Sequence, residues 1–379
     1  MAKVAVVGLG QRGLQHLNAL NQLQEAEVVA LCDPHPDNLR EEKLQQYVEN
    51  FNLGDIYTCD SFQSMLQETP LDAVYFAIPP SRHNGEVITA AQAGLHVLAE
   101  KPVSLYFDEA LEMDRAIRAS NIVACSGFQL RHDLRNLQIR DFLADKDLVM
   151  ANWLINEPLE GHNVKHTRTE ELGGPDNRIW TANRAWSGSS VVEAGIHPVD
   201  LMRFWAGEVI WTRADYAERD NGDIFAGGDN PNAYSVTFGF ENGLIYNLLI
   251  SRLRKTFYSD SYQSIIWDRG HLRWENDNLI AYYYEGSYPP TISPDVKSLR
   301  HPFPEPNRGD ATLALSSSFL RAVHERDESH LLNTFSSSLN SHAAVLAANA
   351  SHELDGRKIR LDEFSASDEY SRFRKKPIT

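Results

Sequence analysis

The chain has 379 residues, more than a single hydrophobic core usually supports, so we expect two domains. Hydrophobic residues make up 42% and charged residues 23%, a balance that excludes long disorder and fibrous repeats. The 36 Lys and Arg residues stand against 52 Asp and Glu residues, and the resulting net charge of -16 would repel a nucleic-acid backbone.

We expect neither a membrane span nor a secretory signal, because no apolar run is long enough and strand-like residues begin at Lys3. Cys32, Cys59 and Cys125 lie at the ends of apolar runs and lack the short spacing of a metal or redox site. The sequence therefore predicts a cytoplasmic protein whose partners include neither a membrane nor a nucleic acid.

Short apolar runs alternate with helical patterns through the first 127 residues. The apolar runs lie at residues 3–8, 27–31, 72–78, 95–99 and 122–126. Helical periodicity follows the first run and returns at residues 36–49, 84–93 and 105–119. Because the runs lack alternation, they predict strands that are buried on both faces of a parallel, doubly wound sheet. Ligands of such sheets bind beyond the carboxyl ends of the strands.

The segment GLGQRG at residues 8–13 spells G-x-G-x-x-G between the first strand and the first helix. Such glycines let the backbone approach a pyrophosphate, whose charge the helix N-terminus stabilises. Asp33 follows about 20 residues later, where a carboxylate can hydrogen-bond the ribose of NAD and would repel the 2'-phosphate of NADP. NAD is therefore favoured over NADP, although Arg12 can in principle meet either the pyrophosphate or a 2'-phosphate.

Four further segments follow in order: PPSRH at 79–83, EKP at 100–102, GFQLR at 127–131 and EAGIHPVD at 193–200. With GLGQRG they resemble the Gfo/Idh/MocA family of oxidoreductases. The resemblance implies a Rossmann domain at residues 1–128, an α+β domain with an open, mainly antiparallel sheet at 129–365, and a C-terminal tail at 366–379. Hairpin patterns at 233–251 and 264–274 and helical patterns at 311–326 and 338–353 support the second domain independently.

The resemblance implies an NAD-dependent dehydrogenase or reductase that acts on a CH–OH group of a sugar, sugar derivative or cyclitol. Such chemistry needs a base within reach of the hydroxyl, and Lys101 and His197 are the candidates, with Glu193 placed to orient the imidazole. The family usually has Asp at position 193 and a glycine triplet at 187–189. For Glu193 and Asp200 a supporting or helix-capping role stays open.

The predicted contacts fall into two sets. Those for the cofactor are Gly8, Gly10, Gln11, Arg12, Gly13, Asp33, Ile78, Pro79, His83, Glu100 and Lys101. Those for the substrate are Lys101, Arg131, Trp153, Asn156, Trp180, Arg184, Glu193 and His197. Each has a structural alternative: Lys101 can simply pair with Glu100, and the tryptophans can be core residues.

Two other functions fit the same motifs. In one, tightly bound NAD is reduced only transiently during glycoside cleavage or epimerisation. In the other, the chain is a non-catalytic sensor of NAD and sugar. We expect no metal site, because His162 and His166 lack a third ligand. The resemblance also implies a homo-oligomer, a dimer or tetramer, and an exposed sheet face can serve as its interface.

Overall fold

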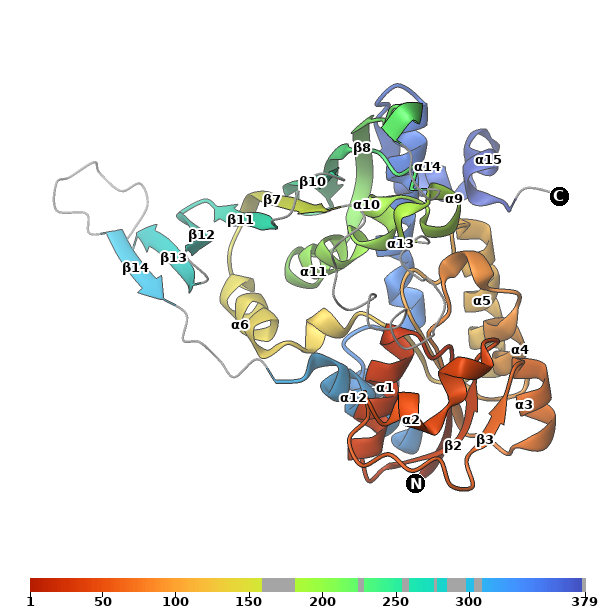
Figure 1. Ribbon diagram of the computed structural model, residues 1–379. Coiled ribbons are helices and arrows are strands. Elements are labelled where there is room, and N and C mark those ends of the chain that lie inside the picture. The colour runs from red at the N-terminus through yellow and green to blue at the C-terminus, as the bar shows by residue number, and fades with distance from the viewer. Residues whose placement is uncertain are drawn as a thin grey trace.

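The computed structural model describes residues 1–158, 181–223, 228–253, 259–275, 278–284, 298–302 and 309–376. Within these ranges, no helix is long and apolar enough to cross a membrane. Two sheets organise the chain, a six-stranded one and a nine-stranded one, and Figure 1 shows the first in the red and orange half of the molecule.

The six-stranded sheet has the order β3-β2-β1-β4-β5-β6, and every neighbouring pair is parallel. Its strands are β1 (Ala2–Val7), β2 (Ala26–Cys32), β3 (Tyr57–Cys59), β4 (Ala73–Phe76), β5 (His96–Ala99) and β6 (Ala124–Ser126). The connecting helices are α1 (Gln11–Gln22), η1 (Pro36–Leu39), α2 (Glu41–Leu44), α3 (Phe62–Glu68), η2 (Pro80–Arg82), α4 (Glu86–Gln92) and α5 (Phe107–Ser120). Strand order reverses between β1 and β4, which confirms the predicted doubly wound Rossmann fold and its crevice for a ligand.

Continuous apolar strands reflect burial on both faces. Along β1, Ala5 and Val7 belong to one hydrophobic cluster, whereas Val4 and Val6 belong to another on the opposite face. One predicted helix differs: residues 36–49 form only η1 and the four-residue α2, because Arg40 between them is extended.

A second, mixed sheet carries the C-terminal half, in the order β14-β13-β12-β11-β7-β10-β9-β8-β15. Its strands are β7 (Leu148–Pro158), β8 (Val209–Ala217), β9 (Ala233–Phe240), β10 (Ile245–Leu253), β11 (Asp260–Trp267), β12 (Gly270–Glu275), β13 (Asn278–Tyr284), β14 (Ser298–Pro302) and β15 (Ile359–Arg360). Only β7 and β10 pair in parallel among these described strands, so the prediction of a mainly antiparallel sheet is confirmed.

Helices cover one face of this sheet or join it to the first domain. They are η3 (Gln129–His132), α6 (Leu134–Leu143), α9 (Arg184–Ser187), α10 (Ser190–Glu193), α11 (Ile196–Ala206), η4 (Asn221–Asp223), α12 (Ala311–Glu325), η5 (Glu328–His330), α13 (Phe335–Glu353), α14 (Leu361–Ala366), η6 (Asp368–Tyr370) and α15 (Ser371–Arg374).

Two C-terminal segments pack differently from the expected domain pattern. Helix α12 lies beside α1, and its Leu315 and Phe319 join the core of the Rossmann sheet (Figure 1). Residues 366–376, expected to be a polar tail, bury Tyr370 and tie Arg374 to Asp108 of α5 at 3.0 Å. The chain therefore crosses back to the first domain, and a continuous second domain at 129–365 stays a prediction.

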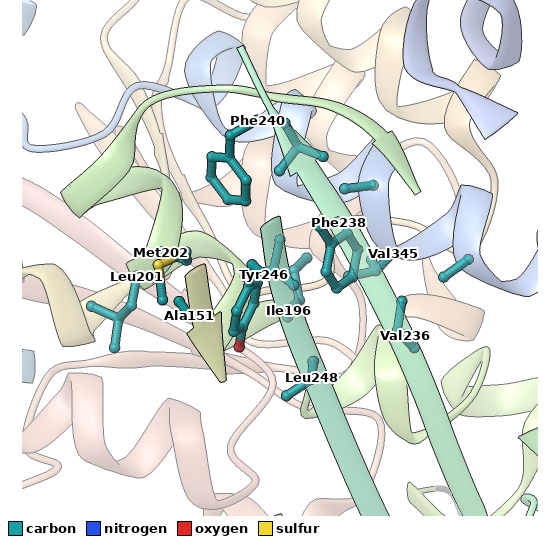
Figure 2. Packing of buried hydrophobic residues seen from close by; sticks show 14 of the residues in the cluster. Ala151, Ile196, Leu201, Met202, Val236, Phe238, Phe240, Tyr246, Leu248 and Val345 are labelled. Carbon is teal, nitrogen blue, oxygen red and sulfur yellow. The ribbon is translucent and has the colours of Figure 1, made fainter. Parts of the chain in front are cut away.

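The core of the second domain lies between the sheet and helices α11 and α13. Figure 2 shows Phe238 and Tyr246 side by side among residues from β7, β9, β10, α11 and α13. Their rings are 5.8 Å apart and nearly stacked. Alternate residues of β9 and β10 point into this core, as the period of a strand requires.

The Tyr246 hydroxyl is buried without a hydrogen-bond partner in the described chain. Because an unsatisfied buried hydroxyl costs free energy, Tyr246→Phe should raise the free energy of unfolding by about 1 kcal/mol. Tyr216 is the matched control, since its hydroxyl donates to Asn349 Oδ1 at 2.9 Å and Tyr216→Phe should lower stability. Thermal and urea unfolding measure both changes, and a loss of stability in Tyr246→Phe would contradict the expectation.

Candidate active site

The glycine turn between β1 and α1 is shaped for close backbone approach. Gly8 has φ +88°, and a Cβ there would lie 2.4 Å from the Ala77 carbonyl oxygen. A Cβ on Gly13 would lie 1.8 Å from the Gly8 carbonyl oxygen. Helix α1 begins at Gln11 after Gly10, and no side chain of the described residues caps it. Its first N–H groups therefore remain for an anionic ligand such as the pyrophosphate of NAD.

Asp33 lies at the carboxyl end of β2, buried next to the glycine turn. One carboxylate oxygen accepts from Leu9 N at 2.7 Å, and the other accepts from His35 N and Asn38 Nδ2, both at 2.9 Å. Behind it, the buried Lys43 donates to Asn38 Oδ1. A carboxylate has about four acceptor positions, so capacity remains for a ribose hydroxyl.

The end of β4 carries the predicted contacts Ile78, Pro79 and His83. His83 is 3% exposed, and neither of its ring nitrogens has a hydrogen-bond partner among the residues that the structure describes. Glu86 Oε2 lies 3.7 Å from its Nδ1, beyond hydrogen-bond distance. Since buried polar atoms are normally satisfied, this orphaned imidazole at the ligand edge fits a contact with a bound cofactor.

Glu100, at the end of β5, belongs to a buried network rather than to an exposed cofactor surface. Its Oε1 accepts from Arg12 Nε at 2.9 Å and Nη2 at 2.7 Å, and lies 2.7 Å from His16 Nε2. Burial raises the pKa of Glu100, but Arg12 and His16 outweigh it and hold the pKa well below its usual range. Arg12 also donates to Thr312 Oγ1 at 3.1 Å. Its guanidinium is thus directed into the protein rather than toward a phosphate.

Lys101 follows directly and pairs with the other domain. Its Nζ donates to the Glu193 carbonyl at 2.7 Å and to Glu193 Oε1 at 3.2 Å. Burial lowers the pKa of His197 well below its ordinary value, and the charge of Lys101 lowers it further. A largely neutral imidazole next to an ammonium group provides both a proton acceptor and a donor to an oxygen atom. Sequence spacing alone left the pairing of Lys101 with Glu100 open, whereas the structure pairs it with Glu193.

The two predicted contacts on β7 lie on opposite faces of the sheet. Trp153 packs against the core on the side of α11, and its Nε1 donates to Ser261 Oγ at 3.2 Å. Asn156 is three positions later, so it points to the other face, where its Oδ1 accepts from Ser251 Oγ at 2.7 Å. Because His197 belongs to α11, only Trp153 shares its side of the sheet.

The predicted substrate arginines are already engaged within the protein. Arg131 donates to both carboxylate oxygens of Asp200, at 2.7 and 2.8 Å, and to the Leu332 carbonyl at 2.8 Å. Arg184 Nη1 donates to Glu218 Oε1 at 3.0 Å. Both guanidinium groups therefore already have a carboxylate partner within the protein. The sequence alone could not reveal these partners, because they lie far away along the chain. Trp180, His162 and His166 lie outside the described residues.

One interdomain contact near these residues was not predicted from the sequence. The guanidinium of Arg82, from η2, lies 5.3 Å from the centre of the Trp186 ring, from α9. Trp186 is 37% exposed, so an apolar ring reaches solvent where the two domains meet. An arginine in PPSRH and a tryptophan before the 187–189 turn were the available signals, but their contact depends on domain placement.

Both halves of the chain match models of one family. The model described as "Oxidoreductase family, NAD-binding Rossmann fold" matches residues 2–128. The model described as "GFO/IDH/MocA C-terminal domain" matches residues 161–273. The two matches follow the order of the two sheets.

The chain is also similar to curated dehydrogenases in sequence and to a solved oxidoreductase in fold. The chain is 26% identical over 276 residues to a myo-inositol 2-dehydrogenase of Thermotoga maritima, covering 72% of this chain and 75% of the relative. It is 25% identical over 206 residues to a D-glucoside 3-dehydrogenase of Escherichia coli, covering 54% of each. An oxidoreductase of Agrobacterium radiobacter, solved with NAD+, L-tartaric acid and magnesium, is similar at a TM-score of 0.72 and 18% identity, over 96% of this chain and 99% of its own.

Proposed function

Because the chain belongs to the Gfo/Idh/MocA family of NAD-binding oxidoreductases, we propose that it is an NAD-dependent dehydrogenase or reductase of a sugar, sugar derivative or cyclitol. The observation that carries this proposal is the contact between Lys101 Nζ, at the carboxyl end of β5, and Glu193 Oε1 at 3.2 Å, with His197 four residues after Glu193. Relatives named for dehydrogenation of an inositol and a glucoside support a polyhydroxylated substrate. We also place the protein in the cytosol.

The chemistry assigns different tasks to the two basic residues. NAD, when bound, supplies the acceptor for the hydride that leaves the substrate carbon. The Lys101 ammonium donates a hydrogen bond to the substrate oxygen and stabilises the charge that develops there. His197, which its lowered pKa keeps neutral, accepts the hydroxyl proton. Glu193 holds Lys101 in place through the contact at 3.2 Å. In the reductive direction the same proton returns from His197 to the oxygen.

A substrate screen tests the function directly. Purified protein is incubated with NAD, then with NADP, and with myo-inositol, scyllo-inositol, methyl glucosides, aldoses and sugar acids, while absorbance of the reduced nicotinamide is recorded. Net reduction of NAD by one of these polyols is the expected result. Binding of NAD by calorimetry without any reduction would contradict the proposal and favour recycling of bound NAD or a sensor.

Asp33 should set the affinity for NAD. Asp33→Ala removes a charged acceptor for the ribose, so the Kd of NAD should rise about 10- to 100-fold, the equivalent of about 1.4–2.8 kcal/mol. Asp60 is the matched control, since it follows the neighbouring strand β3 and is exposed. Isothermal calorimetry measures both variants. Equal affinity of Asp33→Ala and wild type would remove Asp33 from the cofactor site.

We propose further that the protein is a homo-oligomer. Its subunit interface is the outer face of the second sheet, which is the face opposite α11. Leu249 of β10 and Tyr262 of β11 are 41% and 46% exposed on it. On the same face, uncharged side chains form a hydrogen-bonded row that runs across four strands. The row leads from Thr237 through Asn247 and Asn152 to Ser264. Amides donate and accept equally, so a second copy of the same face can satisfy them.

Leu249→Asp should convert the oligomer to a monomer, because two buried carboxylates would face each other across a symmetric interface. Light scattering of the eluting protein measures the mass. Leu134→Asp is the control, since Leu134 is also exposed but belongs to α6 rather than to the sheet. A wild-type protein that is monomeric at micromolar concentration would end the proposal.

A further inference from the structure

Glu100 and Lys101 are adjacent and oppositely charged, yet their side chains have different partners. The Glu100 carboxylate lies with Arg12 and His16 of α1, whereas Lys101 Nζ lies with Glu193 of α10. Only the backbone N–H of Lys101 approaches Glu100, at 3.3 Å from Oε2. The Glu100 carboxylate and the Lys101 ammonium, although adjacent in sequence, therefore do not pair with each other at the end of β5.

We propose that Arg12 is a positioning residue. By pairing with the Glu100 carboxylate, it prevents Lys101 from pairing there, so that Lys101 pairs with Glu193 instead. The inference rests on the proposed function, in which Lys101 contacts the substrate oxygen. Arg12 thus acts on the reaction through two carboxylates and not through a contact with the substrate. It adds a role for the glycine turn besides holding the cofactor.

Arg12 is the cation that the buried carboxylate depends on. Glu100 is 5% exposed, and an ionised carboxylate at that depth requires a paired charge. Burial lowers the pKa of His16, so this histidine supplies a hydrogen bond at 2.7 Å but little positive charge at neutral pH. Arg12 therefore supplies the charge, through Nε and Nη2 together.

The carboxylate has little freedom to find another partner. A Cβ on Gly127 would lie 2.5 Å from the Glu100 carboxyl carbon. The backbone that follows β6 therefore packs tightly against the Glu100 carboxylate. Arg12 itself is held from the side by Thr312 of α12. Lys101 Nζ pairs with Glu193 of α10, and the charges of Lys101, Glu100 and Arg12 all act on the neutral His197 of α11. If Arg12 is removed, Lys101 is the adjacent cation that can turn back to Glu100.

Crystal structures of two variants test this exchange of partners. In Arg12→Leu, Lys101 Nζ should move from Glu193 to about 3 Å from the Glu100 carboxylate. In Arg12→Leu/Glu100→Gln the carboxylate is gone, so Nζ should return to Glu193. If Arg12→Leu does not fold, Arg12→Gln, which keeps hydrogen-bonding atoms without the charge, replaces it in both variants. Lys101 remaining on Glu193 in the single variant would overturn the inference.

Turnover gives a second reading that a purely structural role of Arg12 would not reproduce. With the polyol found in the screen, kcat of Arg12→Leu should fall about 100-fold, the scale of one misplaced acid–base group. Addition of Glu100→Gln should restore kcat to within about fivefold of Glu100→Gln alone. Arg12→Lys should retain most activity, and Thr312→Val should leave the Lys101 partner unchanged. A double variant as slow as Arg12→Leu would also overturn the inference.

The two proposals can fail separately. If Lys101→Met keeps its turnover, the catalytic assignment of Lys101 is wrong, but the crystal structures still decide whether Arg12 controls its partner. If Lys101→Met is inactive and Arg12→Leu is not, only the inference about Arg12 fails.

Discussion

Lys101→Met should lower kcat by about 1,000-fold, the upper end of what one donor to a developing oxyanion contributes, while the Kd of NAD changes less than about threefold. Methionine keeps much of the length and packing of lysine but has no ammonium to hold the substrate oxygen. The proposed cofactor contacts at the glycine turn and Asp33 are unaffected by this change, so binding and turnover should separate. Stopped-flow absorbance and calorimetry measure the two quantities.

The controls for this variant isolate the charge at one position. Lys146 follows the C-terminal end of α6 and pairs with Asp145. Lys146→Met should leave kcat unchanged. Glu193→Gln keeps a hydrogen-bond acceptor for Lys101 and should lower kcat less than Lys101→Met does. If Lys101→Met retains more than about one tenth of wild-type kcat, the assigned role of Lys101 in stabilising the substrate oxygen is wrong.

Local motifs predicted what depends on neighbouring positions in the chain. The GLGQRG turn, the acidic residue after the second strand and the parallel sheet all follow from spacing and burial within a few tens of residues, and the structure has each. Lys101 and Glu193 were recognised as separate motifs, but their contact spans the two domains. Only the folded chain could show that Glu193 and not Glu100 is the partner.

Partners of buried charges were beyond the reach of the sequence. Arg12 and Glu100 are 88 positions apart, and Arg131 and Asp200 are 69 apart, so no periodicity links them. His16, four residues after Arg12 on one helix, was the available signal for a polar network inside an apolar face. The face of β7 on which Asn156 lies was not predictable either, because a strand with polar residues on both faces does not show which face meets α11.

The largest stability change should follow the loss of the Asp200 carboxylate. Asp200 lies on α11, three residues after His197, and accepts from Arg131 of η3 twice and from Ser341 Oγ of α13 at 3.0 Å. These three elements meet where the chain passes from one domain to the other. The ion pair is nearly excluded from solvent, with side-chain exposures of 8% for Arg131 and 2% for Asp200.

Asp200→Ala should therefore destabilise the protein by about 3–5 kcal/mol, since it leaves a buried guanidinium without its counter-charge. Arg131→Met/Asp200→Leu removes this pair and should recover most of that loss, because an apolar pair has no desolvation penalty and Arg203, whose Nη1 lies 3.5 Å from Asp200 Oδ1, keeps Glu208 at 2.6 Å. Glu325→Ala is the surface control: Glu325 is 43% exposed, its partners Arg321 and His330 are 64% and 20% exposed, and the change should cost less than about 1 kcal/mol. Urea unfolding measures all three. A double variant as unstable as Asp200→Ala would mean that the pair acts through its geometry at the domain junction rather than through charge balance, and then His197 should be displaced as well.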